Sequence, residues 1–262
     1  MTNQQSFQLD NQEFGEVYYA LVAKALDICP ISWKSNQSSS NLNFHQFFEK
    51  VFGDNNSSIC KNYRKPQFRL DLAARTDEFL EKLSKWFNDV RVNHMDPEFE
   101  KVDGKKIALI WNRRKGGKDP RDSTDESLRQ LVEVCKKNGY TRVLVGDKVR
   151  DPKKLGFDFD LNNFHGDYQL NHIEQIAYLL KLIDGRPAIS IGLQSGGMDG
   201  LALFGGILTI FLSTKETASN GMSELAKRIP NVFCWCEIQY NGQFEKFDNK
   251  VLQAVDKKIH DY

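Results

Sequence analysis

The stretch KIALIWNRRKGGKDPRDSTDESLRQLVEVCKKNGYTRVLV, residues 106–145, indicates the fold of this chain. It begins with an apolar run that suits a buried strand, KIALIW, and it ends with a second one, TRVLV. Between them, residues 123–138 predict a helix capped by Ser123 or Thr124. The apolar face of that helix consists of Leu128, Leu131, Val132 and Cys135. The stretch therefore predicts one strand–helix–strand unit of a parallel sheet.

The same alternation continues to the end of the sequence. Further strands are expected at 157–161, 188–191, 208–212 and 231–237, and further helices at 172–183, 196–204 and 249–260. The strands are nearly continuous runs of Ile, Leu and Val, which is typical of a sheet covered on both faces. We therefore predict a Rossmann-like α/β domain with a parallel sheet over residues 101–262.

The first hundred residues follow another pattern. Residues 71–92 predict a long amphipathic helix, and strand signals are weak throughout this part. A polar stretch with Pro and Gly, residues 93–106, is the best candidate for a boundary. We therefore expect a smaller, mainly helical region over residues 1–100.

Composition limits the possible partners. The chain has 262 residues, with 36 basic and 35 acidic side chains, so its net charge of +1 provides no general attraction to nucleic acid or to anionic membranes. No apolar run of 18 or more residues predicts a membrane span. The polar N-terminus lacks the pattern of a secretory signal, and the five scattered cysteines suit reduced thiols, so a cytoplasmic location is expected.

The loop after the first of these strands, residues 112–121, is the most unusual segment. It contains five cations and two adjacent glycines directly after a buried strand. Arg113 and Arg114 lie nearest the strand end, where their guanidinium groups would suit phosphate oxygens. The loop thus predicts a diphosphate clamp, and the alternative is a solvated basic loop.

A second glycine-rich loop precedes the helix expected at 196–204. Ser195 is placed to cap this helix, and Gly196 and Gly197 leave room for an anion at its N-terminus, ahead of Asp199. The alternative is that these glycines only let the helix pack closely on the sheet. The spacing of a Walker phosphate loop is absent.

Other polar residues follow later strands. Asp147, directly after TRVLV, is either an acceptor for a ribose or sugar hydroxyl or a turn residue. A loose group after the third strand matches no recognised metal spacing, so no metal site is expected from Asp158, Asp160, His165 and Asp167. Cys234 and Cys236 alternate within an apolar strand and are expected to be structural thiols on one face.

Two segments resemble known enzymes. Residues 172–212, which read HIEQIAYLLKLIDGRPAISIGLQSGGMDGLALFGGILTIFL, are similar to the C-terminal domain of GT-B glycosyltransferases of the heptosyltransferase type. Ser195-Gly196 match the Ser/Thr-Gly turn of that family, whereas Asp199 replaces its usual His and Ile207 its Pro. The segment LIWNRRKGGKD is similar to the His-x-Arg-Arg-x-Asp stretch of GDP-fucose-dependent fucosyltransferases, with Trp111 or Asn112 in place of the His.

The resemblance implies an inverting, metal-independent transfer of a sugar from a nucleotide-sugar donor, with no further cofactor. Arg113 or Arg114 would hold the donor's β-phosphate, Ser195–Gly197 would donate backbone N–H groups, and Asp147 or Glu174 would contact ribose or sugar. Residues 1–100 would be a reduced acceptor-side region, in which Glu16 is one candidate base for an unknown glycan or protein acceptor. The alternative is a catalytically silent protein that binds a nucleotide or sugar-nucleotide.

Overall fold

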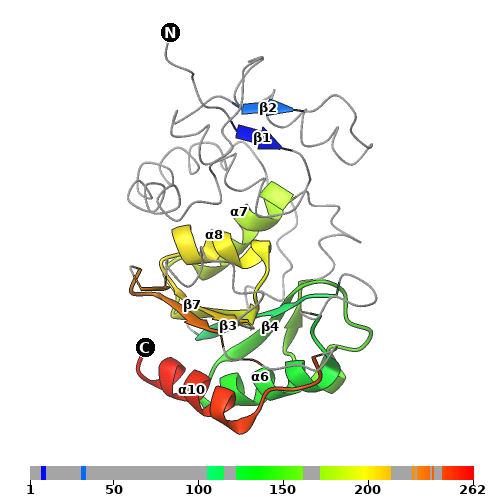
Figure 1. Cartoon of the computed structure of the whole chain (residues 1–262). Coiled ribbons are helices and arrows are strands. Elements are labelled where there is room, and N and C mark those ends of the chain that lie inside the picture. The colour runs from blue at the N-terminus through cyan, green and yellow to red at the C-terminus, as the bar shows by residue number, and fades with distance from the viewer. Residues whose placement is uncertain are drawn as a thin grey trace.

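The computed structural model describes residues 7–9, 31–33, 105–114, 122–161, 172–213, 226–227, 229–236, 238 and 244–262 (Figure 1). For residues 7–9, 31–33, 172–177 and 203–204 it describes the backbone alone. In the first hundred residues it describes one parallel pair, β1 (Phe7–Leu9) and β2 (Ile31–Trp33). The rest of the predicted helical region, and residues 93–104 of the predicted boundary, lie outside the described residues.

The predicted parallel sheet is confirmed. Six strands pair in the order β5-β4-β3-β6-β7-β8, and every pairing is parallel. Their bounds are β3 Ile107–Asn112, β4 Thr141–Gly146, β5 Phe159–Asp160, β6 Ala188–Leu193, β7 Leu208–Leu212 and β8 Val232–Trp235. The chain therefore starts in the middle of the sheet at β3, moves outward to β5, returns to β6 beside β3, and moves outward again to β8.

Helices cover both faces of this sheet. In Figure 1, α6 (Asp125–Lys137) and α10 (Asn249–His260) lie on one face, and α7 (His172–Ile183) and α8 (Gly196–Phe204) lie on the other. A short 3-10 helix, Lys153–Leu155, lies between β4 and β5. This doubly covered parallel sheet is a Rossmann-like α/β arrangement.

Alternation along the strands explains the two layers. Successive side chains of a strand point to opposite faces, so each strand supplies two cores. Toward α6 and α10 the sheet contributes a continuous apolar cluster, which includes Ala108, Ile110, Leu144, Ile189, Ile191, Leu193, Leu208, Ile210 and Leu212. The intervening residues, among them Leu109, Trp111 and Phe211, are also buried and face α7 and α8. Burial on both faces is the reason why the strands are apolar without interruption.

Local signals set the ends of the helices. Thr124 caps α6, because its side chain accepts a hydrogen bond from Ser127 N, and Asp248 caps α10 in the same way through Val251 N. Gly139 follows the last turn of α6 with a φ of 77°, a backbone conformation that glycine adopts without strain. The bounds predicted for α7, α8, α10 and β7 agree with the structure, and Thr124 is the cap rather than Ser123.

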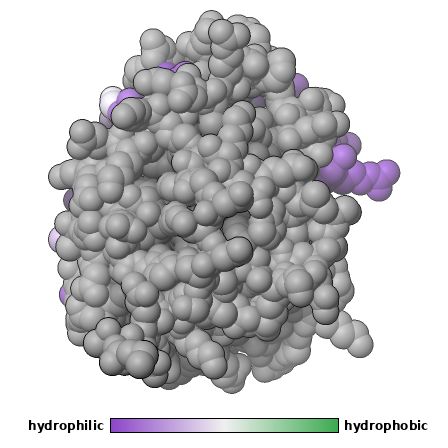
Figure 2. Space-filling model, turned by 90° about the horizontal axis from the view of Figure 1, so that it is seen from above, coloured by the Kyte–Doolittle hydropathy of each residue, from purple (hydrophilic) through white to green (hydrophobic). Residues whose placement is uncertain are grey.

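The described surface is polar. In Figure 2, the described residues that are visible are hydrophilic or close to neutral, and within the described ranges the one large hydrophobic side chain that is exposed is Tyr262. No helix in the described part of the chain is both long enough and apolar enough to cross a lipid bilayer.

Gly146 provides a test of the junction between β3 and β4. It has a φ of 94°, and a Cβ atom there would lie 2.2 Å from the backbone oxygen of Asn112. We expect Gly146→Ala to lower the free energy of unfolding by about 3 kcal/mol, because a strained φ and a backbone clash add. Gly139→Ala is the matched control: its φ is also positive, but no atom lies within 4 Å of the added Cβ. Urea unfolding of Gly139→Ala should show that the free energy of unfolding falls by only about 1 kcal/mol. Equal losses in Gly139→Ala and Gly146→Ala would contradict the backbone clash.

Candidate functional site

The carboxyl ends of β3 and β6 mark the point where the strand order of the sheet reverses, and we call the position outside them the crevice. These strands are neighbours, with Trp111 opposite Gly192, yet the chain leaves β3 toward α6 on one face and β6 toward α8 on the other. Loops that part in this way leave an opening at the strand ends, and open parallel sheets bind ligands there. The two loops selected from sequence, after Asn112 and before Gly196, follow these two strands.

Trp111 lies under this crevice and is 5% exposed. Its indole Nε1 donates a hydrogen bond of 2.9 Å to Ser190 Oγ, so the ring lies across β6. Two glycines make room for it. A Cβ atom on Gly192 would lie 2.7 Å from Trp111 Cβ, and one on Gly197 would lie 2.5 Å from Trp111 Cζ3.

This contact assigns a role to Gly197. The glycine lets the first turn of α8 approach the indole ring, which is the close-packing alternative considered from sequence. The role predicted for Gly197, access for an anion, is therefore not needed to explain this glycine. Gly196 is exposed at the start of the helix, where backbone N–H groups have no partner within the helix.

Asn112 ends β3 and joins it to the loop after β4. Its Nδ2 donates to the backbone oxygen of Asp147 at 2.6 Å, and its own backbone oxygen accepts from Asp147 N at 3.0 Å. A carboxylate oxygen of Asp147 in turn accepts from Arg114 N at 2.6 Å. Asp147 therefore performs the turn role that the sequence offered as its alternative, while its exposed carboxylate retains further lone pairs.

The amide oxygen of Asn112 is an open acceptor. The side chain is 3% exposed, and within the described ranges Oδ1 has no hydrogen-bond partner. Reversing the amide would set its oxygen against the carbonyl oxygen of Asp147, so the Nδ2 contact determines its orientation. A buried acceptor without a partner is costly unless a ligand or water donates to it. Asn112 is thus a binding candidate that sequence reasoning did not select.

Arg113 and Arg114 differ in their surroundings. Arg113 is 4% exposed, and its backbone pairs with Ser123 through bonds of 3.1 Å and 2.7 Å. The guanidinium group of Arg114 donates to the backbone oxygen of Ser123 at 3.2 Å and forms an ion pair with Asp125. The charge of Arg114 is therefore partly matched by the protein itself, and an anion would compete with Asp125 for it.

The N-termini of the two helices that flank the crevice are not equivalent. Thr124 and Ser127 form a reciprocal capping box at the start of α6, and Asp125 and Glu126 add negative charge to its first turn. The N-terminus of α6 is thus satisfied and repels anions. At α8, Ser195 occupies the cap position, but its side chain makes no capping hydrogen bond, contrary to the predicted cap. The open helix N-terminus at the crevice is that of α8.

Asp199 lies in the first turn of α8 and is 6% exposed. A carboxylate at this place is favoured by the helix dipole, and it disfavours a second negative charge nearby. A hydroxyl group of a bound ligand therefore suits Asp199 better than a phosphate group does.

Several candidates lie outside the described residues. The remainder of the basic loop, residues 115–121, and the proposed base Glu16 are among them. Glu174 lies in α7, of which the structure describes only the backbone at that position. Their proximity to the crevice stays a prediction.

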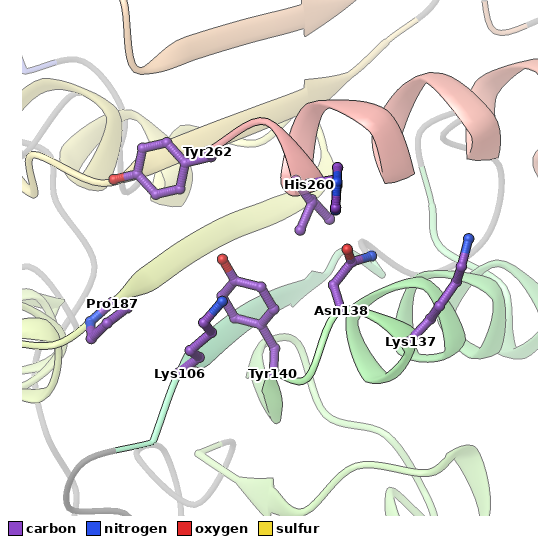
Figure 3. Close-up of a pocket in the computed structure, with 8 residues that line it drawn as sticks. Lys106, Lys137, Asn138, Tyr140, Pro187, His260 and Tyr262 are labelled. Carbon is purple, nitrogen blue, oxygen red and sulfur yellow. The ribbon is translucent and has the colours of Figure 1, made fainter.

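A hollow of about 510 Å³ lies at the opposite end of the strands, next to the residues where β3 and β6 begin. Figure 3 shows Lys106 beside the ring of Tyr140, with its Nζ 5.5 Å from the ring centroid, and Lys137 separated from them by Asn138. The hollow is also lined by Pro187, His260 and Tyr262.

The cations of this hollow already have partners. Lys137 Nζ lies 2.5 Å from Asp256 Oδ2, and this hydrogen bond, with one from Asn138, holds the pKa of Asp256 below its ordinary value. Helices α6 and α10 both end here, and basic side chains in a last turn complement the partial negative charge of helix C-termini. The hollow therefore needs no ligand to explain its composition.

The loose acidic group after β4 is partly accounted for. Asp158 accepts hydrogen bonds from the backbone N and the guanidinium group of Arg142, at 2.7 Å and 2.8 Å. Within the described ranges no group of three or more His, Cys, Asp or Glu side chains could hold a metal ion.

Comparison of the chain with protein-family models, with curated proteins and with solved structures finds no match. What the crevice binds must therefore be inferred from its own residues and geometry.

The contact between Trp111 and Gly197 can be tested by a double-mutant cycle. Gly197→Ala should lower the free energy of unfolding by about 2 kcal/mol, because the added methyl group overlaps the indole ring. Trp111→Phe alone removes ring atoms and the bond to Ser190. If the two groups touch, the double variant Trp111→Phe/Gly197→Ala should be more stable than the sum of the single losses implies, by 0.5 kcal/mol or more. Additive losses in urea unfolding would contradict the contact.

Proposed function

We propose that this chain is a glycosyltransferase-like protein that transfers a sugar from a nucleotide-sugar donor, with the donor's diphosphate in the crevice between β3 and β6. One observation carries the proposal: the two loops with phosphate-binding character leave neighbouring strand ends at the point where the strand order reverses. The resemblance of residues 172–212 to GT-B donor-binding domains adds the class of donor.

The diphosphate would meet the open N-terminus of α8. The first N–H groups of a helix lack partners within it, and among the described residues Met198 N bonds to Ser195 O, so those of Gly196 and Gly197 would be the ones to meet phosphate oxygens. Arg113, one residue beyond the end of β3, would supply positive charge to the same diphosphate. Both groups gain strength as charge develops on the departing diphosphate, so they favour the transition state over the bound donor.

Hydroxyl groups of the donor would meet acceptors on the other side of β3. Asn112 Oδ1 is buried and, within the described ranges, has no partner, and Asp147 carries an exposed carboxylate beside it. Acceptors of this kind match ribose or sugar hydroxyls and do not match phosphate oxygens. The arrangement would therefore orient the donor, with hydroxyls toward β4 and phosphates toward α8.

The transfer step is a displacement at the anomeric carbon. The acceptor hydroxyl attacks this carbon, the bond to the diphosphate oxygen breaks, and the hydroxyl proton passes to a base, with inversion of configuration. The candidate base Glu16 lies outside the described residues. The role of the described half would be to hold the leaving group.

A second function, nucleotide or sugar-nucleotide binding without transfer, is favoured by the charge balance at the crevice. The guanidinium group of Arg114 is paired with Asp125, and Asp199 adds a carboxylate to the first turn of α8. These contacts reduce the positive charge available to a leaving diphosphate, whereas they leave hydroxyl recognition intact.

A donor panel separates the two functions. The full-length chain is incubated with UDP-, GDP-, ADP- and CMP-sugars, and its melting temperature and the hydrolysis of each donor are followed. A rise in melting temperature with hydrolysis supports transfer, and a rise without hydrolysis supports the binding function. No rise with any donor contradicts both.

Arg113→Ala should lower the affinity for the best-binding donor by roughly 10-fold to 100-fold, since a hydrogen bond to a charged group contributes about 1.5–3 kcal/mol. Arg113→Lys keeps the charge without the planar guanidinium group, so its affinity should lie between those of the unmodified chain and Arg113→Ala. Lys106→Ala is the matched control, a cation of the hollow at the other edge of the sheet. Isothermal titration that shows a loss with Lys106→Ala and none with Arg113→Ala would move the site to that hollow.

Asp125→Asn tests whether Arg114 belongs to the site. The substitution frees the guanidinium group from its ion pair, so diphosphate affinity should rise by up to about 5-fold, the size of an exposed ion pair. Glu126→Gln removes the same charge from the same turn, but Glu126 pairs with Arg129 instead. Equal gains in the two variants would indicate a general charge effect, and no gain with Asp125→Asn would exclude Arg114.

A further inference from the structure

Two cysteines at the edge of the sheet lie in direct contact. Cys234 Sγ and Cys236 Sγ are 3.2 Å apart, and both side chains are half-buried. They belong to β8, the outermost strand on that side of the sheet, and to the residue just beyond its end. The sequence predicted structural thiols on one face, and the structure adds that the two sulfur atoms touch.

Alternation along β8 directs both sulfurs away from α10. Phe233 and Trp235 face α10, where Lys258 Nζ and Lys250 Nζ lie 5.7 Å and 5.5 Å from their ring centroids. The residues between them point to the opposite face. The two thiols therefore share one side of the strand, and Cys236 lies past the last strand residue, where its backbone belongs to no strand.

The separation is suited to a covalent bond. A disulfide requires an S–S distance of about 2.05 Å and a Cα–Cα distance of about 4.4–6.8 Å. Two residues in alternate positions of a strand are about 6.6 Å apart at Cα, within this range. Closing the bond from 3.2 Å needs a movement of roughly 1 Å, which is small for side chains at a strand end.

From this contact we propose that Cys234 and Cys236 form a redox-active dithiol, a modification site that a small disulfide such as glutathione disulfide oxidises to an intrachain disulfide. The inference is independent of the function of the crevice, because it depends only on the two sulfur atoms.

The order of attack follows from the surroundings of the two thiols. Burial, with the hydrogen bond to Cys236, raises the pKa of the Cys234 thiol. We assign the first attack to Cys236, because the thiolate is the attacking species and this residue lies beyond the end of β8. Its thiolate attacks one sulfur of the small disulfide, whose S–S bond breaks, and one small thiolate leaves and takes up a proton. Cys234 then loses its proton and attacks Cys236 Sγ, which expels the second small thiolate. In total the two cysteines lose two electrons and two protons, and the small disulfide becomes two thiols.

Cys135 is an internal control. It lies on the buried face of α6, and burial raises its pKa to about 12, so it should not react in the folded chain. A reagent that oxidises Cys135 together with the pair is acting on unfolded protein.

Peptide mapping tests the proposal on the native chain. The folded protein is equilibrated with glutathione buffers of rising oxidation, quenched with acid, alkylated and digested with trypsin. Both cysteines fall in the tryptic peptide 229–246. We expect this peptide to become unalkylated and lighter by two hydrogen atoms, while Cys135 stays a free thiol. Recovery of peptide 229–246 with both cysteines alkylated at every ratio would overturn the proposal.

Single variants test the order of attack. Cys234→Ser should accumulate glutathione on Cys236, because the second attack is impossible, and Cys236→Ser should react at least about 10-fold more slowly. The opposite order of rates would overturn the assignment of Cys236 as the first thiol. Phenylarsine oxide, which requires two adjacent thiols, should protect peptide 229–246 from alkylation in the native chain and in neither variant; protection in a single variant would contradict a paired site.

Discussion

The contact between Trp111 and the two glycines of β6 and α8 is the constraint on which the crevice depends. The indole ring lies across β6, bonded to Ser190, and neither Gly192 nor Gly197 could carry a Cβ atom without overlap. The ring thereby determines how closely α8 approaches the sheet and where its first N–H groups lie. A smaller residue at this position would remove this contact and let α8 pack more closely on the sheet.

The positive charge available at the crevice depends more on which cations already form ion pairs than on how many cations there are. The basic loop begins with two arginines, but one is tied to Asp125, and the helix that follows it is closed by its own capping box. Of the two helix N-termini that follow β3 and β6, that of α8 is therefore the one without a side-chain cap. The same reasoning accounts for the basic hollow at the other edge, where lysines meet two helix C-termini and Asp256. At both ends of the strands, basic side chains are thus partly neutralised by carboxylates of the protein itself.

The loops that follow neighbouring strands present different hydrogen-bonding groups. Between β3 and β4, three hydrogen bonds link Asn112 and Arg114 to Asp147, and this link depends on the positive φ of Gly146. It leaves acceptors on that side, whereas the loop before α8 leaves donors. A ligand with hydroxyls at one end and phosphates at the other matches this polarity.

The sequence by itself determined the parallel sheet, most helix bounds and the two loops, because apolar periodicity and capping residues are local signals. It also placed Arg113, Ser195 and Asp147 at strand and helix ends. Only the tertiary structure decided that Gly197 serves the packing of Trp111, that Asp125 holds Arg114, that Ser195 leaves α8 uncapped and that Asn112 keeps an acceptor open. Each of these facts depends on which strands are neighbours in the sheet and on the directions in which their side chains point. The distance between two residues along the sequence reveals neither the neighbours nor the directions.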